Sequence, residues 1–283
     1  VIFIFLNVSP VFGASPDKNT KEIIANSENF FEGKFRNIKT TYTNLRTLER
    51  KSTLKEWFFP PEDKNPLGPL PTIKFKGQDL TEGKFVWFGH STLLMKTEGL
   101  VVMTDPVFNR ASPLPSFSSK SKSSFFNGKP FVFENPILIE DLPKVDVVII
   151  SHDHYDHLDS KAIKDLSNLV DHFIVPLGVG AHLERWGVDK NKITELDWYE
   201  SKSYKDVEFI FAPALHFSGR GITNGNSTLW GSWIVKSKSL SAYFSGDGGY
   251  SETFKKLGNE YGPFDIAFIE NGAYNIDWSN VHM

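Results

Sequence analysis

The sequence predicts an α/β protein, and two patterns support that prediction. Short, mostly apolar runs such as Val145 to Ile150 are typical of buried strands. Segments with helical periodicity follow several of these runs, so strands and helices alternate along the chain. With 283 residues, of which 40% are hydrophobic, the chain can bury one substantial core, and its size permits one domain or two.

The first residues have a composition of their own. Val1 to Ala14 is apolar and gives way abruptly to the polar stretch Ser15 to Glu22. This pattern is typical of the end of a secretory signal, with small residues near a possible cut at Gly13 or Ala14. The alternative is a buried first strand, because Phe12 fits poorly in the small-residue pattern before a cut at Ala14. If residues 1 to 14 are the remnant of a signal peptide, the protein is expected to be exported, to the periplasm or to a membrane.

Residues 15 to 75 are expected to form an extension and linker in front of the main domain. Lys21 to Phe31 and Thr41 to Trp57 show mixed helical patterns. The run from Phe59 to Pro71 is punctuated by prolines and cannot continue a helix.

Residues 76 to 283 carry the alternating pattern and form the expected main domain. Glu98 and Gly99 suit a hairpin turn between two of its strands. The predicted strands are Phe85 to Phe88, Ser91 to Lys96, Leu100 to Thr104, Val145 to Ile150, Val207 to Leu215 and Leu240 to Phe244. The predicted helices are Lys161 to Leu169, capped by Asp159 or Ser160, then Val179 to Trp186, and Glu252 to Tyr261, opened by Ser251.

Charge and cysteine content narrow the function classes. Lys and Arg number 31 against 34 Asp and Glu, which gives a formal net charge of -3. The chain therefore has no overall positive charge that would favour binding of DNA or RNA, and nucleic acid is not an expected partner. The chain has no cysteine, so disulfides and thiolate metal sites are excluded and any metal must use His and carboxylate ligands.

A dense cluster of potential metal ligands follows the strand Val145 to Ile150. Its sequence is His152-Asp153-His154-Tyr155-Asp156-His157. Residues two apart point the same way at a strand end, so His152 and His154 can bind one ion while Asp156 and His157 turn toward a second. Neither site is complete with two ligands, so other strand ends must supply more.

Two downstream residues are candidates for the missing ligands. His216 closes the segment Val207 to Leu215, and Asp247 lies in a glycine-rich turn after the strand Leu240 to Phe244. Glycines let the backbone turn sharply, so the short Asp247 carboxylate can reach inward and bridge two ions. Taken alone, His216 could be a core histidine and Asp247 an ordinary turn residue. Their order behind the first cluster favours the metal site.

Taken together and in this order, the motifs resemble the metallo-β-lactamase superfamily. Within this superfamily they are similar to the branch of N-acylphosphatidylethanolamine-hydrolysing phospholipase D and its bacterial relatives. The motifs around His216 and Trp230 indicate this branch. The matching segments are Phe88-Gly89-His90-Ser91-Thr92, Met103-Thr104-Asp105-Pro106, Ser151 to Asp159, Pro213 to Arg220, Leu229-Trp230-Gly231-Ser232-Trp233 and Gly262-Pro263-Phe264-Asp265. They span about residues 84 to 283.

The resemblance implies a four-layer αβ/βα sandwich with two zinc ions at one edge of its sheets. The implied ligands are His152, His154 and His216 for the first zinc, Asp156 and His157 for the second, and Asp247 as the bridge. The resemblance places the last histidine ligand of the second zinc further along the sequence, after a residue that matches His282. The fold is therefore expected to be C-terminally incomplete, and the alternative is that His282 itself serves as the ligand.

The chain departs from the family pattern at two places. Gly248 stands where a threonine is usual, and Glu270 and Asn271 stand where an apolar residue or proline is more common. Both departures leave the ligands intact but bear on rate and substrate preference.

Several residues near the motifs are candidates for supporting roles. His90 could orient a metal ligand through a hydrogen bond or contact the substrate, and a buried structural histidine is the alternative. Asp105 is expected to brace the metal loop without binding metal. Trp230, Trp233, Tyr250 and Tyr274 could line a substrate groove, although aromatic residues on strands more often belong to the core. His172 and His182 lie outside the pattern and are expected on the surface.

The expected activity is hydrolysis of a phosphodiester in a phospholipid-like substrate by water activated between two zinc ions. Asp156 and Asp247 would be catalytic through the metals, with Asp247 positioning the water, and His282 could protonate the leaving group. The alternatives are a lactonase or amide hydrolase using the same metals, and a non-catalytic zinc-binding fragment. Asn109 to Pro136 mixes Lys and Phe, so it could contact a membrane surface, or it could be a solvated insertion. The sequence does not predict the oligomeric state.

Overall fold

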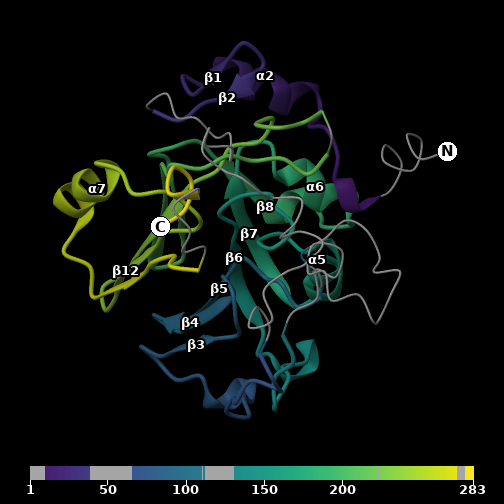
Figure 1. The fold of residues 1–283 in the computed structure, drawn as a ribbon, viewed down its shortest axis with the longest axis vertical. Coiled ribbons are helices and arrows are strands. Elements are labelled where there is room, and N and C mark those ends of the chain that lie inside the picture. Colours follow the sequence, from purple (N-terminus) through teal and green to yellow (C-terminus); the bar gives the residue numbers. More distant parts are fainter. Residues whose placement is uncertain (1–9, 39–65, 110, 112–130, 222, 273–277) are drawn as a thin grey trace.

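In the computed structural model, two β-sheets stack face to face and helices cover their outer faces (Figure 1). The structure describes residues 10–38, 66–109, 111, 131–221, 223–272 and 278–283. The strands are β1 (Phe30–Phe31), β2 (Lys34–Phe35), β3 (Phe85–Trp87), β4 (Leu93–Thr97), β5 (Leu100–Thr104), β6 (Val145–Ile149), β7 (Val170–Pro176), β8 (Ile193–Leu196), β9 (Ser201–Tyr204), β10 (Val207–Ala212), β11 (Ser232–Lys236), β12 (Ser241–Phe244) and β13 (Ile266–Phe268). The helices are α2 (Lys18–Asn26), α5 (Ser160–Leu166), α6 (Gly180–Arg185) and α7 (Thr253–Tyr261), with short 3-10 turns η1 (Pro10–Phe12), η3 (Gly77–Asp79), η4 (Ile139–Asp141) and η5 (Lys190–Lys192).

The first large sheet has six strands in the order β3-β4-β5-β6-β7-β8. The β3–β4 and β4–β5 pairs are antiparallel, whereas β5 to β8 run parallel. The turn between β4 and β5 contains only Glu98 and Gly99, both with positive φ, as a tight hairpin of this kind requires. The hairpin predicted there is confirmed.

The second large sheet has five strands in the order β13-β12-β11-β10-β9. Its pairs are antiparallel except for β12 and β13, which are parallel. The strand predicted as Val207 to Leu215 ends earlier, at Ala212, because Pro213 has no N–H to donate to a neighbouring strand.

The main core lies between the two sheets. Alternate residues of each strand face it: Val147 and Ile149 of β6 belong to this core, whereas Val148 and Ile150 face the opposite side. Trp230 and Trp233 are fully buried in it. Both are therefore core residues, and neither lines a groove.

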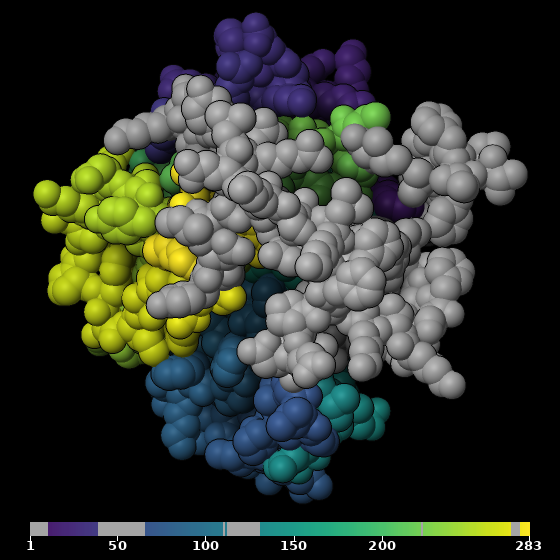
Figure 2. Space-filling model, in the orientation of Figure 1, coloured from purple at the N-terminus to yellow at the C-terminus, as the bar shows by residue number. Residues whose placement is uncertain are grey.

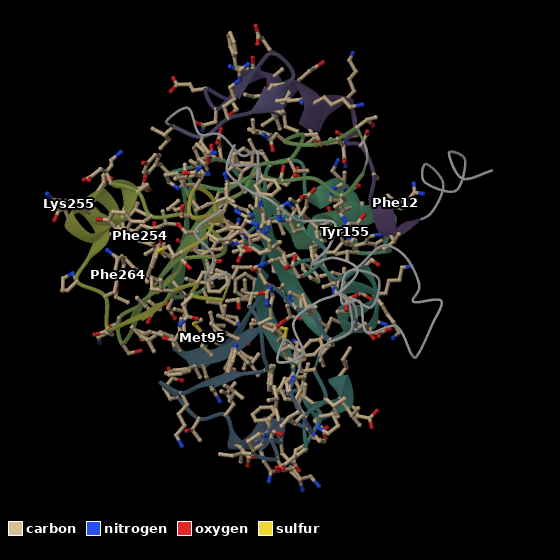
Figure 3. The ribbon with its side chains drawn as sticks, viewed as in Figure 1. Phe12, Met95, Tyr155, Phe254, Lys255 and Phe264 are labelled. Atoms are coloured by element: carbon tan, nitrogen blue, oxygen red, sulfur yellow. The ribbon has the colours of Figure 1, made fainter. Side chains whose placement is uncertain are left out.

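Helices complete the outer layers. Ile163 of α5 and Leu183 of α6 pack on the six-stranded sheet. Leu257 of α7 packs on the five-stranded sheet, and Phe254 and Phe264 cover the same face (Figure 3). The order of layers is helix, sheet, sheet, helix, so the predicted αβ/βα arrangement is confirmed. None of the helices among the described residues is long and apolar enough to cross a bilayer.

The N-terminal part differs from the prediction. The helix expected over Lys21 to Phe31 is α2, which begins at Lys18 behind the N-cap Asp17 and ends at Asn26. Phe30 instead begins a small hairpin in which β1 pairs with β2, and Phe35 is completely buried in the main core. The helix expected over residues 41 to 57 lies outside the described residues.

Candidate metal centre

The polar residues of the motifs gather where strands of both sheets end. Asp105 follows β5, the loop of residues 151–158 (the metal loop) follows β6, and Asp247 lies after β12. Because β5 and β6 are parallel neighbours, their carboxyl ends meet at one edge of the sheet. The second sheet is tied to this edge by Gly231, whose N–H donates to the Ser151 carbonyl over 3.0 Å. A side chain at Gly231 would collide with the Ala212 carbonyl, so this close approach requires glycine.

Three imidazoles form the first group of donors. Nε2 of His152 lies 2.9 Å from Nδ1 of His154, and Nε2 of His216 lies 3.2 Å from that same Nδ1. His152 and His216 are each 1% exposed, so water does not surround these nitrogens. Three nitrogens that face one another in this way form a ready site for one cation.

Neighbouring groups fix which nitrogen of each ring carries the proton. Ser151 donates from Oγ to Asp105 over 2.6 Å, which leaves Oγ free to accept from Nδ1 of His152 at 2.9 Å. Nδ1 of His216 donates to the Val281 carbonyl over 2.9 Å. Both rings therefore present an unprotonated Nε2 to the centre of the group, as ligands do.

His157 begins the second group. Its Nδ1 donates to Oδ2 of Asp105 over 2.8 Å, so Nε2 faces the centre. Asp247 Oδ2 lies 3.1 Å from that nitrogen, yet Nε2 is buried and makes no hydrogen bond of acceptable geometry. Asp156 lies next to it and pairs with His90 at 3.3 Å. A buried ring nitrogen that faces a carboxylate without a well-formed hydrogen bond fits a cation-binding site.

The charges of the two groups differ in the protein without metal. Burial, with help from the neighbouring imidazoles, lowers the pKa of His152 well below its ordinary value and that of His216 to about 3. Burial acts in the same direction on His157, but Asp247, Asp105 and Asp156 outweigh it and raise the pKa of that imidazole. The first group is therefore neutral, whereas the second gathers opposite charges around His157.

His282 also reaches this centre. Its Nδ1 contacts Glu270 Oε1 at 2.5 Å and lies 3.8 Å from Asp247 Oδ2. Glu270 accepts through its other oxygen from the N–H of Gly248 over 2.8 Å. With His216 and Asp247, His282 forms a further group whose donor atoms lie within 4.8 Å of one another.

The donor set fits two neighbouring metal ions. Four overlapping groups of at least three donors have atoms within 4.8 Å of one another: His152, His154 and His216; His152, His157 and Asp247; His90, Asp156 and His157; and His216, Asp247 and His282. Four residues each belong to two of these groups: His152, His157, His216 and Asp247. The candidate sites therefore adjoin one another. The His90 and Asp156 side chains are 54% and 43% exposed, so solvent reaches the centre on this side.

The structure brings all six residues predicted as ligands to one place, together with His90, Asp105 and His282. The half-exposed His90 excludes the alternative of a buried structural histidine. Tyr274 lies outside the described residues, and Tyr250 is exposed. The prediction that His182 lies on the surface is wrong, because this residue is only 2% exposed. His172 is half-buried and contacts Thr194.

Several residues around the centre were missed by the sequence reasoning. Ser151 connects Asp105 to two of the rings, and Glu270 holds His282. Asp153 sits within the ligand motif but turns away from the rings and accepts from the N–H of Gly219 over 2.7 Å. Arg220 was part of a recognised motif but carried no assigned role, because a long-range contact leaves no local signal in the sequence.

A four-layer fold with this cluster of His and Asp at one edge defines a metal-dependent hydrolase of the β-lactamase type. The chain belongs to the metallo-β-lactamase superfamily: the Beta-lactamase superfamily domain matches residues 101–283. An uncharacterised protein of Mycobacterium tuberculosis is 36% identical over 286 residues, which cover 98% of this chain and 73% of that protein.

Two of the relatives are named as phospholipases. N-acyl-phosphatidylethanolamine-hydrolyzing phospholipase D 1 of Caenorhabditis elegans is 36% identical over 250 residues, covering 83% of this chain and 67% of the worm protein. The mitochondrial N-acyl-phosphatidylethanolamine-hydrolyzing phospholipase D of Saccharomyces cerevisiae is 28% identical over 200 residues, covering 68% of this chain and 40% of the yeast protein.

Proposed function

We propose that this protein is a zinc-dependent phosphodiesterase that acts on phospholipid-like substrates. The observation that carries the proposal is the convergence of four overlapping donor groups at one edge of the sheets, where the buried Nε2 of His157 faces Asp247 without a well-formed hydrogen bond. His152, His154 and His216 would hold one zinc, Asp156 and His157 the other, and Asp247 would bridge them. Imidazole and carboxylate ligands without thiolates suit zinc, and a bound pair of ions would activate water and stabilise charge on a phosphoryl group.

The protein's own residues supply the remaining features of the site. Asp105 and Ser151 hold the rings of His152 and His157 in their ligand orientation. His282 contacts Glu270 and lies 3.8 Å from Asp247, and in this proposal it would transfer a proton to the leaving group.

The substrate class is inferred from the surface near the open side of the site and from the relatives. Trp87 is 66% exposed, and its indole N–H donates to the His90 carbonyl over 2.8 Å. An exposed tryptophan beside the accessible end of the donor cluster suits a substrate with an apolar part. The worm and yeast relatives are both named for hydrolysis of an N-acylated phospholipid.

A peripheral contact with a membrane belongs to the same proposal. The Lys- and Phe-containing stretch of residues 109 to 136 on which it rests lies largely outside the described residues. Co-sedimentation with anionic liposomes, before and after deletion of residues 116 to 129, tests it. Equal binding by the two proteins rejects a membrane role for this stretch.

The test of the activity combines metal counting with a substrate panel. Purified protein is loaded with zinc, its zinc content is measured, and hydrolysis of N-acylphosphatidylethanolamine, a soluble phosphodiester, an acyl-lactone and a β-lactam is followed. We expect close to two zinc ions per chain and preference for the phosphodiesters. Asp156→Asn should lose one zinc ion and most of the turnover. Asp165→Asn, which changes a surface ion pair with Lys161, should keep both zinc ions and the wild-type turnover.

The same panel separates the alternatives. Hydrolysis of the lactone or the β-lactam without phosphodiesterase activity would favour a lactonase or amide hydrolase. One tightly held zinc without any turnover would favour a non-catalytic zinc protein. An Asp156→Asn protein with wild-type zinc content and rate would contradict the assignment of the ligands.

A further inference from the structure

A buried arginine links the metal loop to the N-terminal segment. Arg220 is 3% exposed, and its Nη1 donates to the carbonyls of Asp153 and Leu158, each over 2.7 Å. These two carbonyls lie on either side of His154, Asp156 and His157 in the sequence. One guanidinium group therefore holds both ends of the stretch that carries these three ligand candidates.

The other edge of the same guanidinium binds the N-terminal segment. Nε and Nη2 of Arg220 both donate to the Val11 carbonyl over 3.1 Å. The guanidinium lies over the ring of Tyr155 at 4.2 Å and over that of Trp186 at 5.0 Å, and the Tyr155 hydroxyl donates to the Arg220 carbonyl. Figure 3 shows Phe12 and Tyr155 on this side of the molecule.

A second, separate connection runs through His182. The N–H of Ala14 donates to Nδ1 of His182 over 2.9 Å, so the proton of the neutral ring is on Nε2. That Nε2 faces Asp153 Oδ2 at 3.4 Å, and the other oxygen of Asp153 accepts from Gly219. His182 and Asp153 are 2% and 0% exposed, so these polar groups depend on one another for partners.

The backbone of the segment is shaped for this contact. Gly13 has φ of +77°, and a Cβ atom there would lie 2.2 Å from Nδ1 of His182. Only glycine satisfies both the left-handed conformation and the close approach to the ring.

We propose that Val11–Ala14 is a positioning segment, which holds the metal loop in its ligand geometry through Arg220 and His182. The inference rests on the metal site proposed above but not on its substrate or reaction. It also requires the segment to remain in the working protein, in contrast to the expectation that a signal is cut at Gly13 or Ala14.

The test compares two glycine substitutions in the full chain. Gly13→Ala places a Cβ in the His182 ring, whereas Gly83→Ala introduces the same left-handed strain, at φ of +73°, where no atom lies within 4 Å. Zinc affinity is measured by competition with a chromophoric chelator, and the ligand geometry by the visible absorption of bound Co²⁺. We expect Gly13→Ala to weaken binding by about 10-fold and to alter the Co²⁺ spectrum, with Gly83→Ala unchanged.

A second readout does not require metal or activity. Hydrogen exchange of the metal-free protein reports on the N–H groups of His157 and Leu158, which donate to the His154 carbonyl. Gly13→Ala, and Arg220→Lys, which cannot reach Val11, Asp153 and Leu158 at once, should speed exchange in the metal loop but not in β6. The inference would remain if zinc binding and loop protection behaved in this way in a protein without phosphodiesterase activity.

Three results would overturn the inference. The first is a Gly13→Ala protein with the zinc affinity, Co²⁺ spectrum and loop exchange of Gly83→Ala. The second is faster exchange spread evenly over β6 and β10, which would show a general loss of stability. The third is a mature chain from the native host that begins at Ser15, as determined by mass spectrometry.

Discussion

At the scale of single residues, Asp105 accepts three hydrogen bonds in the centre. It is completely buried, and it accepts from the Ser151 N–H over 2.7 Å, from the Ser151 hydroxyl and from His157. Because carboxylate oxygens only accept, Asp105 determines that His157 carries its proton on Nδ1 and keeps Nε2 for a metal.

We therefore expect Asp105→Asn to weaken zinc binding by about 10-fold or more, because an amide N–H in place of Oδ2 would face the His157 N–H. Isothermal titration of the metal-free protein measures the affinity. The control is Asp171→Asn, which removes only a surface ion pair with Lys144. An affinity that is equal in wild type and Asp105→Asn would show that Asp105 does not determine the orientation of His157.

Glu270 shows how a departure from a family pattern acts at this scale. Its carboxylate accepts from the Gly248 N–H and holds His282. We expect Glu270→Gln to reduce kcat several-fold at unchanged zinc content, because His282 loses the charge that orients it. Rate and zinc measurements on the same preparations test this, and an unchanged kcat would assign Glu270 a purely structural role.

At the scale of elements, the metal loop is fixed where it enters α5. Asp159, the N-cap, accepts from the N–H groups of Lys161 and Ala162 and also from the N–H of Asn109 over 2.8 Å. Asp159 is 4% exposed, and its hydrogen bond from the N–H of Ala162 is buried. The cap therefore joins the segment after β5 to the helix that follows the ligands.

Asp159→Ala should lower the free energy of unfolding by about 2 kcal/mol, because it removes the cap and leaves buried donors unpaired. Urea unfolding followed by circular dichroism measures this. Asp189→Ala removes the cap of the short, exposed turn η5 and should cost less than about 1 kcal/mol. Equal losses in the two variants would contradict the role assigned to Asp159.

The comparison of prediction with structure also belongs to this scale. Six strands of the two large sheets, β3 to β6, β10 and β12, were predictable because apolar runs, a Glu98–Gly99 turn and Pro213 give local signals. The other five strands, β7, β8, β9, β11 and β13, were not predicted. The ligand candidates were predictable because they follow strand ends in a fixed order. The predicted N-terminal helix begins at Lys21, three residues later than α2. The difference arises because the prediction does not use Asp17, which caps α2 by accepting from the Thr20 N–H.

Contacts between distant segments could not be predicted. His182 is buried by Ala14, which is 168 residues away in the sequence, and by Asp153. Arg220 contacts Val11 across 209 residues. No periodicity or capping pattern encodes such pairs, so only the folded chain reveals them.

At the scale of the whole molecule, the two sheets bring ligands from separate halves of the chain to one edge. The metal loop belongs to the first sheet, whereas His216 and Asp247 follow strands of the second. On the face shown in Figure 2, the yellow residues of the C-terminal end border the blue residues of the first sheet. A metal pair held across this edge would connect the sheets, so metal binding and folding should be coupled.

We expect zinc to raise the thermal unfolding midpoint by several degrees relative to protein in EDTA, because the metal binds the folded state and not an equivalent site in the unfolded chain. Differential scanning fluorimetry measures the shift. His154→Ala should lose most of it, whereas His172→Ala, which changes a half-buried ring bonded to Thr194, should retain it. An equal shift in both variants would mean that zinc stabilises the protein at another site.

The buried histidines also make the metal-free protein sensitive to acid. Burial lowers the pKa values of His152, His154 and His216, the last to about 3. The unfolded chain binds these protons near pH 6.5, whereas the folded chain does not, so the unfolded state binds more protons between these limits. These three histidines therefore lower the free energy of unfolding as the pH drops below about 6.5.

His157 does not offset this loss. Its pKa is raised in the folded protein, so below about pH 6.5 it is protonated in both states and contributes no slope there. Urea unfolding in EDTA between pH 7 and pH 5 should show stability falling by about 1.4 kcal/mol per pH unit for each fully responding histidine. His216→Asn should reduce the slope by about one proton. A flat or rising stability over this range would show that the three rings are not held neutral, and the first donor group would then lack the charge state that a cation requires.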